Sequence, residues 1–244
     1  MELSKNQIKL IKSLNQKKQR SKQNLFVAEG KKVVNELLSS SFELKDLFVG
    51  SELVSLFENE NYQVITENEL KKISLLKSPN GVFAVFKIPK EKEVITKGLI
   101  VALDAINDPG NLGTIIRLCD WFGIEQLVCS EDTVDCYNAK VVQATMGSLS
   151  RVNISYVPLQ KYLLQTTLPK FCADMDGENV YHNKLPKEGI LVMGNEANGV
   201  SKAIADACTD KIMIPRFGML KETESLNVAS ATSILLSEFK RNTL

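Results

Sequence analysis

Three loops of this chain carry amide, carboxylate or guanidinium side chains directly after runs of apolar residues. They cover residues 104–117, 194–201 and 215–227. Short apolar runs predict buried strands, and ligands on mostly parallel sheets gather beyond the carboxyl ends of the strands. If the three strands are neighbours, the loops converge on one pocket. The polar side chains there that could contact a ligand include Asn111, Arg117, Glu196, Ser225 and Asn227.

The sequence lacks the standard nucleotide-binding and nucleophile motifs. The second loop, GNEANGVS, has two glycines at the separation of a phosphate-binding P-loop, but Val200 stands where that motif requires lysine. No GxGxxG follows a predicted strand, and GxSxG is absent. His182 is the only histidine, and we expect it to be solvated in its polar loop. The sequence therefore argues against a His-based triad and a His-containing metal site.

The third loop precedes the helix that the sequence marks most clearly. Small and apolar residues recur at helical spacing from Leu226 to Arg241. Ser225 suits the helix N-cap, which places Asn227 in the first turn, where a polar side chain can reach a ligand. Taken alone, the pattern also fits an ordinary final strand and helix of an α/β domain.

Strand and helix patterns alternate along the chain and divide it in two. Residues 1–88 predict a small α/β domain, in which a Lys-, Arg- and Gln-rich loop spans residues 15–24. Residues 89–98 predict a charged linker. Residues 99–244 predict a mostly parallel sheet with helices on both sides. Their expected strands are 99–103, 126–129, 153–157, 171–173, 190–193 and 211–214, and their expected helices are 112–122, 138–149, 159–164, 202–207 and 226–241.

Composition bounds the class of protein. Hydrophobic residues make up 44% and charged residues 24% of the chain, which are ordinary globular values. No run approaches the roughly 20 apolar residues of a membrane span, and the N-terminus is too charged for a signal peptide. The five cysteines form no CxxC pair, so we expect buried, reduced thiols and no metal. These observations predict a cytoplasmic protein without a membrane partner.

Positive charge is concentrated near the N-terminus. Residues 1–32 carry nine Lys or Arg against two Glu, although the whole chain has a net charge of only +1. Such a basic arm favours a polyanionic partner, and a solvated helix face is the alternative. If the partner is RNA, the expected phosphate contacts are Lys17, Lys18, Arg20, Lys22, Lys31 and Lys32.

A resemblance to a known family rests on three motifs in order: NDPGNLGTIIR, LVMGNEANGVS and IPRFG…ESLNVASA. Together they resemble the motifs of the SpoU (TrmH-like) RNA ribose 2'-O-methyltransferases of the SPOUT class. The stretch before them, KKQRSKQNLFVAEGKKVVNELL, is similar to the L30e-like substrate-binding domain of many members. The resemblance implies an α/β fold with a trefoil knot, which periodicity alone could not predict, a homodimer, and S-adenosylmethionine as cofactor.

The resemblance also implies roles for individual residues. The positions that hold the cofactor, largely through backbone groups, are matched by Met193, Gly194, Ile214, Leu226 and Val228. The catalytic and substrate-binding positions are matched by Asn111, Arg117, Glu196, Ser225 and Asn227. Two features depart from the family pattern. Ala229 stands where serine is more frequent, and residues 216–224 form a longer loop, in which charge is brought near the pocket by Lys221, Glu222 and Glu224.

The chemistry implied is an in-line methyl transfer, which needs aligned reactants more than a metal ion. In family accounts, the arginine that matches Arg117 removes the proton from the ribose hydroxyl. A guanidinium with a pKa above about 12 is a poor proton acceptor. We therefore favour Arg117 as a phosphate clamp that stabilises alkoxide charge, with base catalysis as the alternative. Glu196 is expected to orient Arg117 or to hold its loop.

Ribosomal RNA is the favoured substrate, because the first domain resembles ribosomal-protein-like RNA binders. One alternative is a transfer RNA 2'-O-methyltransferase. Another is a non-catalytic RNA-binding or ribosome-assembly protein on the same scaffold. The site residues at 111, 117, 196 and 227 argue against a non-catalytic protein.

Overall fold

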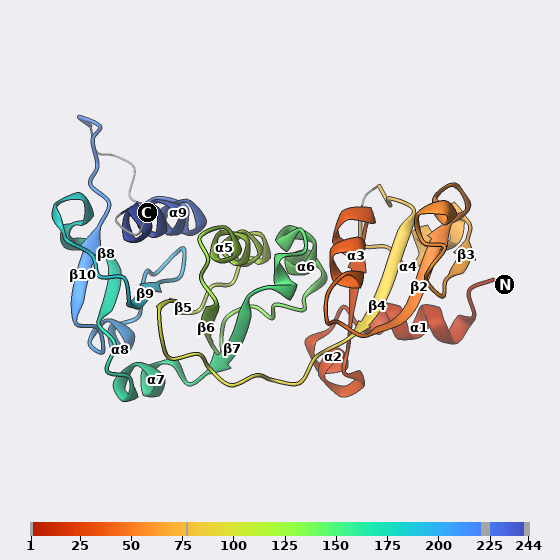
Figure 1. The fold of residues 1–244 in the computed structure, drawn as a ribbon, viewed down its shortest axis with the longest axis horizontal. Coiled ribbons are helices and arrows are strands. Elements are labelled where there is room, and N and C mark those ends of the chain that lie inside the picture. Colours follow the sequence, from red (N-terminus) through yellow and green to blue (C-terminus); the bar gives the residue numbers. More distant parts are fainter. Residues whose placement is uncertain (1, 77, 221–224, 242–244) are drawn as a thin grey trace. The chain divides into compact units, whose positions relative to one another are not determined.

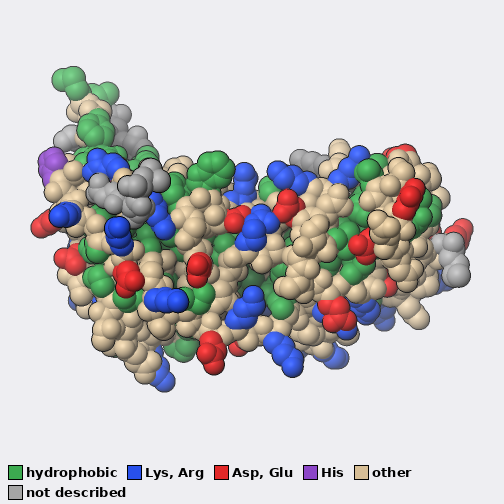
Figure 2. Space-filling view, viewed as in Figure 1, with side chains coloured by type: hydrophobic (Ala, Val, Ile, Leu, Met, Phe, Trp, Pro, Cys, Tyr) green, Lys and Arg blue, Asp and Glu red, His purple; other side chains and the backbone are tan. Residues whose placement is uncertain are grey.

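The computed structural model describes residues 2–76, 78–220 and 225–241. These residues form two compact units, each with its own sheet (Figure 1). Unit 1 comprises residues 1–90 and 135–150, and unit 2 comprises residues 91–134 and 151–244. Charged side chains of both signs are interspersed on the face seen in Figure 2. None of the helices in the described ranges is long and apolar enough to cross a membrane.

Unit 1 is built on a four-stranded sheet in the order β1-β4-β2-β3. β4 pairs antiparallel with β1 and β2, and β3 pairs with β2 in parallel. The strands are β1 (Leu25–Glu29), β2 (Leu44–Gly50), β3 (Gln63–Ile65) and β4 (Val82–Lys87). The helices are α1 (Lys5–Ser13), α2 (Lys17–Gln23), α3 (Lys31–Leu38), α4 (Glu67–Ile73) and α6 (Ala139–Thr145), with the 3-10 turns η1 (Ser51–Leu56) and η2 (Ser148–Ser150).

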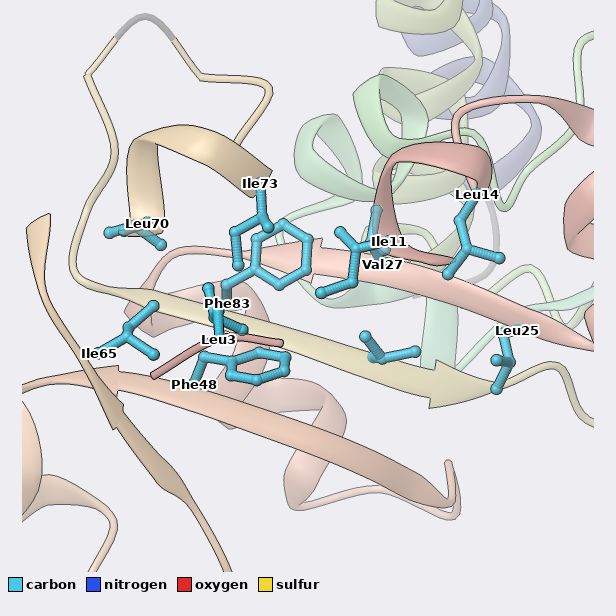
Figure 3. Packing of buried hydrophobic residues seen from close by; sticks show 11 residues of the cluster. Leu3, Ile11, Leu14, Leu25, Val27, Phe48, Ile65, Leu70, Ile73 and Phe83 are labelled. Atoms are coloured by element: carbon cyan, nitrogen blue, oxygen red, sulfur yellow. The ribbon is translucent and has the colours of Figure 1, made fainter. Parts of the chain in front are cut away.

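The core of unit 1 lies between its sheet and the helices α1 and α4 (Figure 3). Phe48 and Phe83 are buried on the central strands and pack there with aliphatic side chains from both helices. Burial of side chains this size contributes about 1.5–3 kcal/mol each relative to exposure. A capping box between Ser4 and Gln7 starts α1 and so places its apolar face on the sheet.

The prediction of a loop over residues 15–24 is wrong, because α2 occupies most of it. Lys, Gln and Arg are good helix formers, and the helix ends where Asn24 adopts a left-handed conformation with a φ of 55°. The residue that α2 buries is Arg20. No apolar period marked this helix, because its inward side chain is charged.

α6 belongs to unit 1, although the predicted second domain contains it. Tyr137, which precedes α6, packs on Phe26 of β1 with ring centroids 4.9 Å apart. Ala139 packs against the core of unit 1. Residues 135–150 therefore fold with unit 1 while lying between two segments of unit 2 in the sequence.

Unit 2 is built on a six-stranded sheet in the order β10-β8-β9-β5-β6-β7, and every pairing in it is parallel. The parallel sheet with its helices confirms the predicted α/β fold with a mostly parallel sheet in the second half of the chain. The strands are β5 (Leu99–Leu103), β6 (Gln126–Ser130), β7 (Asn153–Val157), β8 (Lys170–Asn179), β9 (Gly189–Met193) and β10 (Asp210–Met213). The helices are α5 (Pro109–Trp121), α7 (Leu159–Gln165), α8 (Lys202–Ala205) and α9 (Val228–Arg241), with the 3-10 turn η3 (Val180–His182).

The strands before the first two polar loops, β5 and β9, are neighbours. Every residue of both strands is buried, which explains their continuous apolar runs. β8 separates β9 from β10, so the strand before the third loop is not their neighbour. The third loop therefore starts two strand positions away from β9.

Most of the predicted linker, residues 91–98, belongs to unit 2. The carbonyl oxygen of Glu93 accepts a hydrogen bond from Nδ2 of Asn153 at 2.9 Å. The N–H of Ile95 donates to Oε1 of Gln126 at 2.9 Å. Val94, between them, packs against the core of this unit.

Candidate active site

Asn111 lies in the first turn of α5, on a rigidly capped helix. Asp108 is the N-cap, and its Oδ1 accepts a hydrogen bond from the N–H of Asn111 at 2.8 Å. Pro109 takes the first helical position, where a missing N–H costs no intrahelical bond. The sequence Asp-Pro-Gly-Asn thus fixes the backbone position of Asn111 at the start of the helix.

The side-chain amide of Asn111 joins the other two loops. Its Nδ2 donates to Oε1 of Glu196 at 2.8 Å, and its Oδ1 accepts from Nδ2 of Asn227 at 2.9 Å. An ionised carboxylate can only accept, so Glu196 requires the NH₂ side of Asn111 to face it. The structure therefore brings together one predicted site residue from each loop in a single hydrogen-bonded chain.

Asn227 is the N-cap of α9. Its Oδ1 accepts hydrogen bonds from the N–H groups of Ala229 and Ser230, at 3.0 and 3.2 Å. These two donors hold the amide oxygen toward the helix and turn Nδ2 toward Asn111. The predicted N-cap at Ser225 is wrong, because the helix begins two residues later than expected, at Val228. Asn227 accordingly precedes the first turn rather than lying in it.

The second loop is shaped by close backbone approach at Gly194. A Cβ there would lie 2.1 Å from the nitrogen of Val200, so only glycine fits. Asn195 and Gly199 exchange two backbone hydrogen bonds of 2.9 Å, which close the loop. Glu196, at the tip, is exposed and reaches Asn111 from this closed ring.

The first and second loops are also locked to each other by residues that the sequence analysis did not select. Nδ2 of Asn195 donates to the carbonyl oxygen of Ala105 at 2.6 Å, and Oδ2 of Asp104 accepts from the N–H of Ser201 at 2.7 Å. Ala105 has a φ of 54°, a left-handed conformation that costs about 1–2 kcal/mol for a residue with a Cβ. Asp104 directly ends the apolar run of β5, and that position is the signal that could have found it.

Arg117 does not join the chain of hydrogen bonds around Asn111. It lies six residues further along α5, about 120° around the helix, and its side chain is exposed. It has no hydrogen bond or ion pair within the described residues, and Glu196 bonds Asn111 rather than Arg117. A role of Glu196 in orienting Arg117 stays a prediction. Ser225 is likewise exposed, with no hydrogen bond in the described part of the chain.

The expected cofactor positions offer apolar walls and unused backbone groups. Met193 and Val228 are buried, at 2% and 6% exposure. The backbone N–H and C=O groups of Gly194, Ile214 and Leu226 have no hydrogen-bond partner among the described residues. Leu226 is half-exposed and Gly194 and Ile214 are partly buried, so these groups are open to water or to a ligand.

The third loop exposes large apolar side chains before it reaches Asn227. Phe217, Met219 and Leu220 are each more than four-fifths exposed. Figure 2 shows this apolar surface in green on the projecting segment at the upper left. The charges expected near the pocket from Lys221, Glu222 and Glu224 lie outside the described residues.

The basic side chains of unit 1 divide into exposed and buried groups. Arg20 is only 3% exposed, and its guanidinium donates twice to Oδ2 of Asp135, at 2.5 and 2.8 Å. It also donates to the carbonyl oxygens of Leu14 and Asn15. The prediction that Arg20 contacts RNA is therefore wrong, because its donors are used inside the protein. The expected RNA contacts that remain exposed are Lys17, Lys18, Lys22, Lys31 and Lys32.

The cysteines and the histidine lie as expected. All five cysteines are free thiols, and all but Cys208 are buried. Burial raises the pKa of the Cys119 thiol far above its usual range, so this thiol is not a nucleophile. His182 is exposed, as expected. No group of three or more His, Cys, Asp or Glu side chains that could hold a metal ion occurs within the described residues.

Comparison with known proteins shows which family the chain belongs to. The family model of SpoU rRNA methylases matches residues 98–237. The chain belongs to the SpoU rRNA methylase family. A second model, of the MRM3-like substrate-binding domain, matches residues 5–84. The resemblance read from the three motifs and from the basic first domain is therefore confirmed.

SpoU relatives match the chain over its whole length. It is 30% identical to RlmP, the 23S rRNA (guanosine(2553)-2'-O)-methyltransferase of Bacillus subtilis, over 97% of both chains. It is 36% identical to a TrmH-family protein from Porphyromonas gingivalis, with a TM-score of 0.90 and 99% of each chain covered. An AdoMet-bound rRNA methyltransferase from Sinorhizobium meliloti is 27% identical, with a TM-score of 0.87 and coverage of 100% and 97%. These matches span both units.

Proposed function

We propose that this chain methylates a ribose 2'-hydroxyl in the RNA of the large ribosomal subunit, with S-adenosylmethionine as the methyl donor. The observation that carries the proposal is the hydrogen-bonded chain of Glu196, Asn111 and Asn227, which joins the three SpoU motifs at one edge of the sheet. Ribosomal RNA is favoured over transfer RNA because RlmP acts on 23S rRNA and matches both units of this chain.

Bound S-adenosylmethionine would supply an electrophilic methyl group on its sulfonium. The protein would hold the methyl donor and the ribose and align them for the transfer. The free backbone groups of Gly194, Ile214 and Leu226 would bind the cofactor, between the walls that Met193 and Val228 form. An in-line transfer requires a fixed geometry, and rigid loops at the cofactor and at the ribose provide it.

The hydrogen bonds that link Glu196, Asn111 and Asn227 would keep the loops closed around the reactants. Arg117 would clamp a substrate phosphate and stabilise negative charge that develops on the ribose oxygen. A permanently charged guanidinium suits that role better than proton removal. Base catalysis by Arg117 stays the alternative.

A homodimer accounts for the exposure of Arg117. Arg117 and Trp121 lie one turn apart on the same face of α5, and Trp121 is 84% exposed. In the proposed dimer a second protomer covers this face, and Arg117 acts in the site whose Asn227 belongs to that second protomer. The trefoil knot and the cytoplasmic location stay predictions from the sequence and the resemblance.

Mixed dimers test the placement of Arg117. Protomers carrying Arg117→Ala are combined with protomers carrying Asn227→Ala, and methyl transfer is measured for the purified heterodimer. If Arg117 acts across the dimer, one of the two sites is intact, and about half of the wild-type activity returns. An inactive heterodimer, formed from stable protomers, would place Arg117 and Asn227 in the same protomer's site.

The substrate is tested in cells. Ribose methylation of ribosomal and transfer RNA is mapped with and without the gene for this chain. Loss of one 2'-O-methyl mark from the large-subunit RNA is the expected result. Loss of a transfer RNA mark instead would redirect the proposal to transfer RNA. If no mark is lost and the purified protein binds RNA but not S-adenosylmethionine, the protein is a non-catalytic RNA binder.

A further inference from the structure

A groove of about 560 Å³ opens in unit 1, at the start of α3. Its lining includes Lys31 and Lys32 of α3, Glu52 of η1, Asn80 from the loop before β4, and Gln143 of α6. The groove therefore combines the basic end of a helix with two side-chain amides. Asn80 and Gln143 have no role in the proposed methyl transfer.

The α3 side of the groove suits an anion. Gly30 is the N-cap of α3 and provides no side-chain cap, and no acidic residue lies in the first turn. The N–H groups of Lys31, Lys32 and Val33 have no hydrogen-bond partner within the described residues. Both lysine side chains are exposed beside them. Free N–H groups at a helix N-terminus together with two ammonium groups favour a phosphate.

The opposite side of the groove contains an unsatisfied amide. Oε1 of Gln143 is buried and has no hydrogen-bond partner. Nε2 of Gln143 and Nδ2 of Asn80 lie 4.0 and 3.7 Å from the position that a Cβ on Gly30 would take, so both amides flank the start of α3. A buried carbonyl oxygen without a donor lowers stability, whereas Nε2 of the same amide faces the start of α3 and has no acceptor within the described residues.

Acidic side chains limit how much of the groove an anion can use. Glu29 is buried in the lining and is already bonded by Oγ of Ser74 and the N–H of Leu75, at 2.5 and 2.8 Å. Glu52 lies toward Gly50 and Gly81. A run of several phosphates would meet more repulsion from these carboxylates than one phosphate held at α3 by two lysines. The lining therefore suits a ligand with one anionic end and one neutral, hydrogen-bonding end.

We propose that this groove binds one unpaired nucleotide of the RNA substrate. Its phosphate lies at the N-terminus of α3 between Lys31 and Lys32, and an acceptor on the edge of its base bonds Nε2 of Gln143, beside Asn80. Unpaired nucleotides are the part of RNA that proteins read by base edges. The inference rests on the proposed function, because it assigns part of that enzyme's substrate recognition to unit 1.

The test compares full-length variants on an unmodified large-subunit rRNA transcript. Lys31→Ala/Lys32→Ala removes two charges, and Gln143→Met removes the amide while nearly keeping its volume. The matched control is Lys71→Ala/Lys72→Ala, an exposed adjacent pair on α4 that does not line the groove. The readouts are the KM for RNA, the dependence of RNA affinity on salt, the Kd for S-adenosylmethionine, and the Tm.

We expect the Lys31/Lys32 variant to raise the KM for RNA about tenfold or more and to reduce the log–log salt slope by about 1–2. Gln143→Met should raise the KM about fivefold, as expected for one hydrogen bond, without changing the salt slope. Its Tm should stay equal or rise, since an unsatisfied buried oxygen is removed. The Kd for S-adenosylmethionine and the control pair should stay at wild-type values.

Wild-type KM values for both groove variants would overturn the inference. A lowered Tm for Gln143→Met would also overturn it, because the amide would then be structural. If the wild-type chain transfers no methyl group, the proposed function fails separately. Filter binding of the same transcript still tests the groove in that case. The inference predicts weaker RNA binding by both groove variants, and wild-type affinity in both would overturn it.

Discussion

Asn227 performs two tasks that one pair of substitutions can separate. Its Oδ1 caps α9, and its Nδ2 donates to Asn111. Asn227→Ala removes both functions. Asn227→Asp keeps an oxygen for the cap and adds negative charge at the positive end of the helix, where charge of that sign is favourable. It cannot donate to Asn111, so it tests the hydrogen-bonded chain alone.

The expected magnitudes differ for the two variants. Asn227→Ala should lower the free energy of unfolding by about 1 kcal/mol for the lost cap and by about 0.5 kcal/mol for the lost bond to Asn111. Asn227→Asp should change it by less than about 0.5 kcal/mol. In the Asp variant Asn111 lies between two carboxylates, and its single NH₂ group can face only one of them. We expect kcat to fall at least tenfold in both variants, about 1.4 kcal/mol of barrier.

The assay pairs urea unfolding with methyl transfer to large-subunit rRNA. The decisive variant is Asn227→Asp, because its fold is kept while its bond to Asn111 is lost. Turnover at the wild-type rate in that variant, at unchanged stability, would refute the reasoning. It would show that the chain of bonds from Glu196 to Asn227 holds the loops without serving the reaction. A stability loss as large as in Asn227→Ala would refute the capping role of the oxygen.

Four further predictions follow from single residues. Arg117→Ala should abolish methyl transfer while the Kd for S-adenosylmethionine, measured by calorimetry, stays within about twofold of wild type, since the arginine acts on the substrate. Gly194→Ala should lower the free energy of unfolding by about 2 kcal/mol or more in urea, because the added Cβ meets backbone atoms at 2.1 Å. Arg20→Ala should cost about 2–3 kcal/mol by leaving Asp135 unpaired, while the salt slope of RNA binding stays unchanged. Hydrogen bonds from two backbone N–H groups and a hydroxyl lower the pKa of Glu69 to about 2. Its stabilising contribution is complete above about pH 4.5 and should be lost as pH falls toward 2. Glu69→Gln should therefore make the free energy of unfolding less dependent on pH over that range.

Apolar patterns predicted the sheet of unit 2 well. β5 and β7 occupy the expected residues, although β5 is buried throughout and β7, at the edge of the sheet, is only half-buried. Order along the chain does not give order in the sheet. β8 intervenes between β9 and β10, and no residue in the third loop signals that separation. The meeting of the loops was therefore visible only through Asn111 and Asn227.

Charged and polar side chains with structural tasks were the main source of error. Arg20 was assigned to RNA because a basic arm is normally solvated, but its guanidinium satisfies Asp135 and two carbonyl oxygens inside unit 1. Asp135 lies 115 residues away, and no local pattern predicts such a pair. Ser225 and Asn227 are both good N-caps, so residue type could not decide between them. Leu226 was counted in the apolar period, but its side chain is half-exposed and the helix begins at Val228.

The most direct test of the central claim is the fate of a labelled methyl group. The purified chain is incubated with S-[methyl-³H]adenosylmethionine and an unmodified large-subunit rRNA transcript, and the RNA is digested to nucleosides for mass spectrometry. We predict that the label appears in a single 2'-O-methylated nucleoside and that Asn111→Ala abolishes it. Label on a base, or unchanged labelling by Asn111→Ala, would contradict a ribose methyl transfer at the site where the three loops meet.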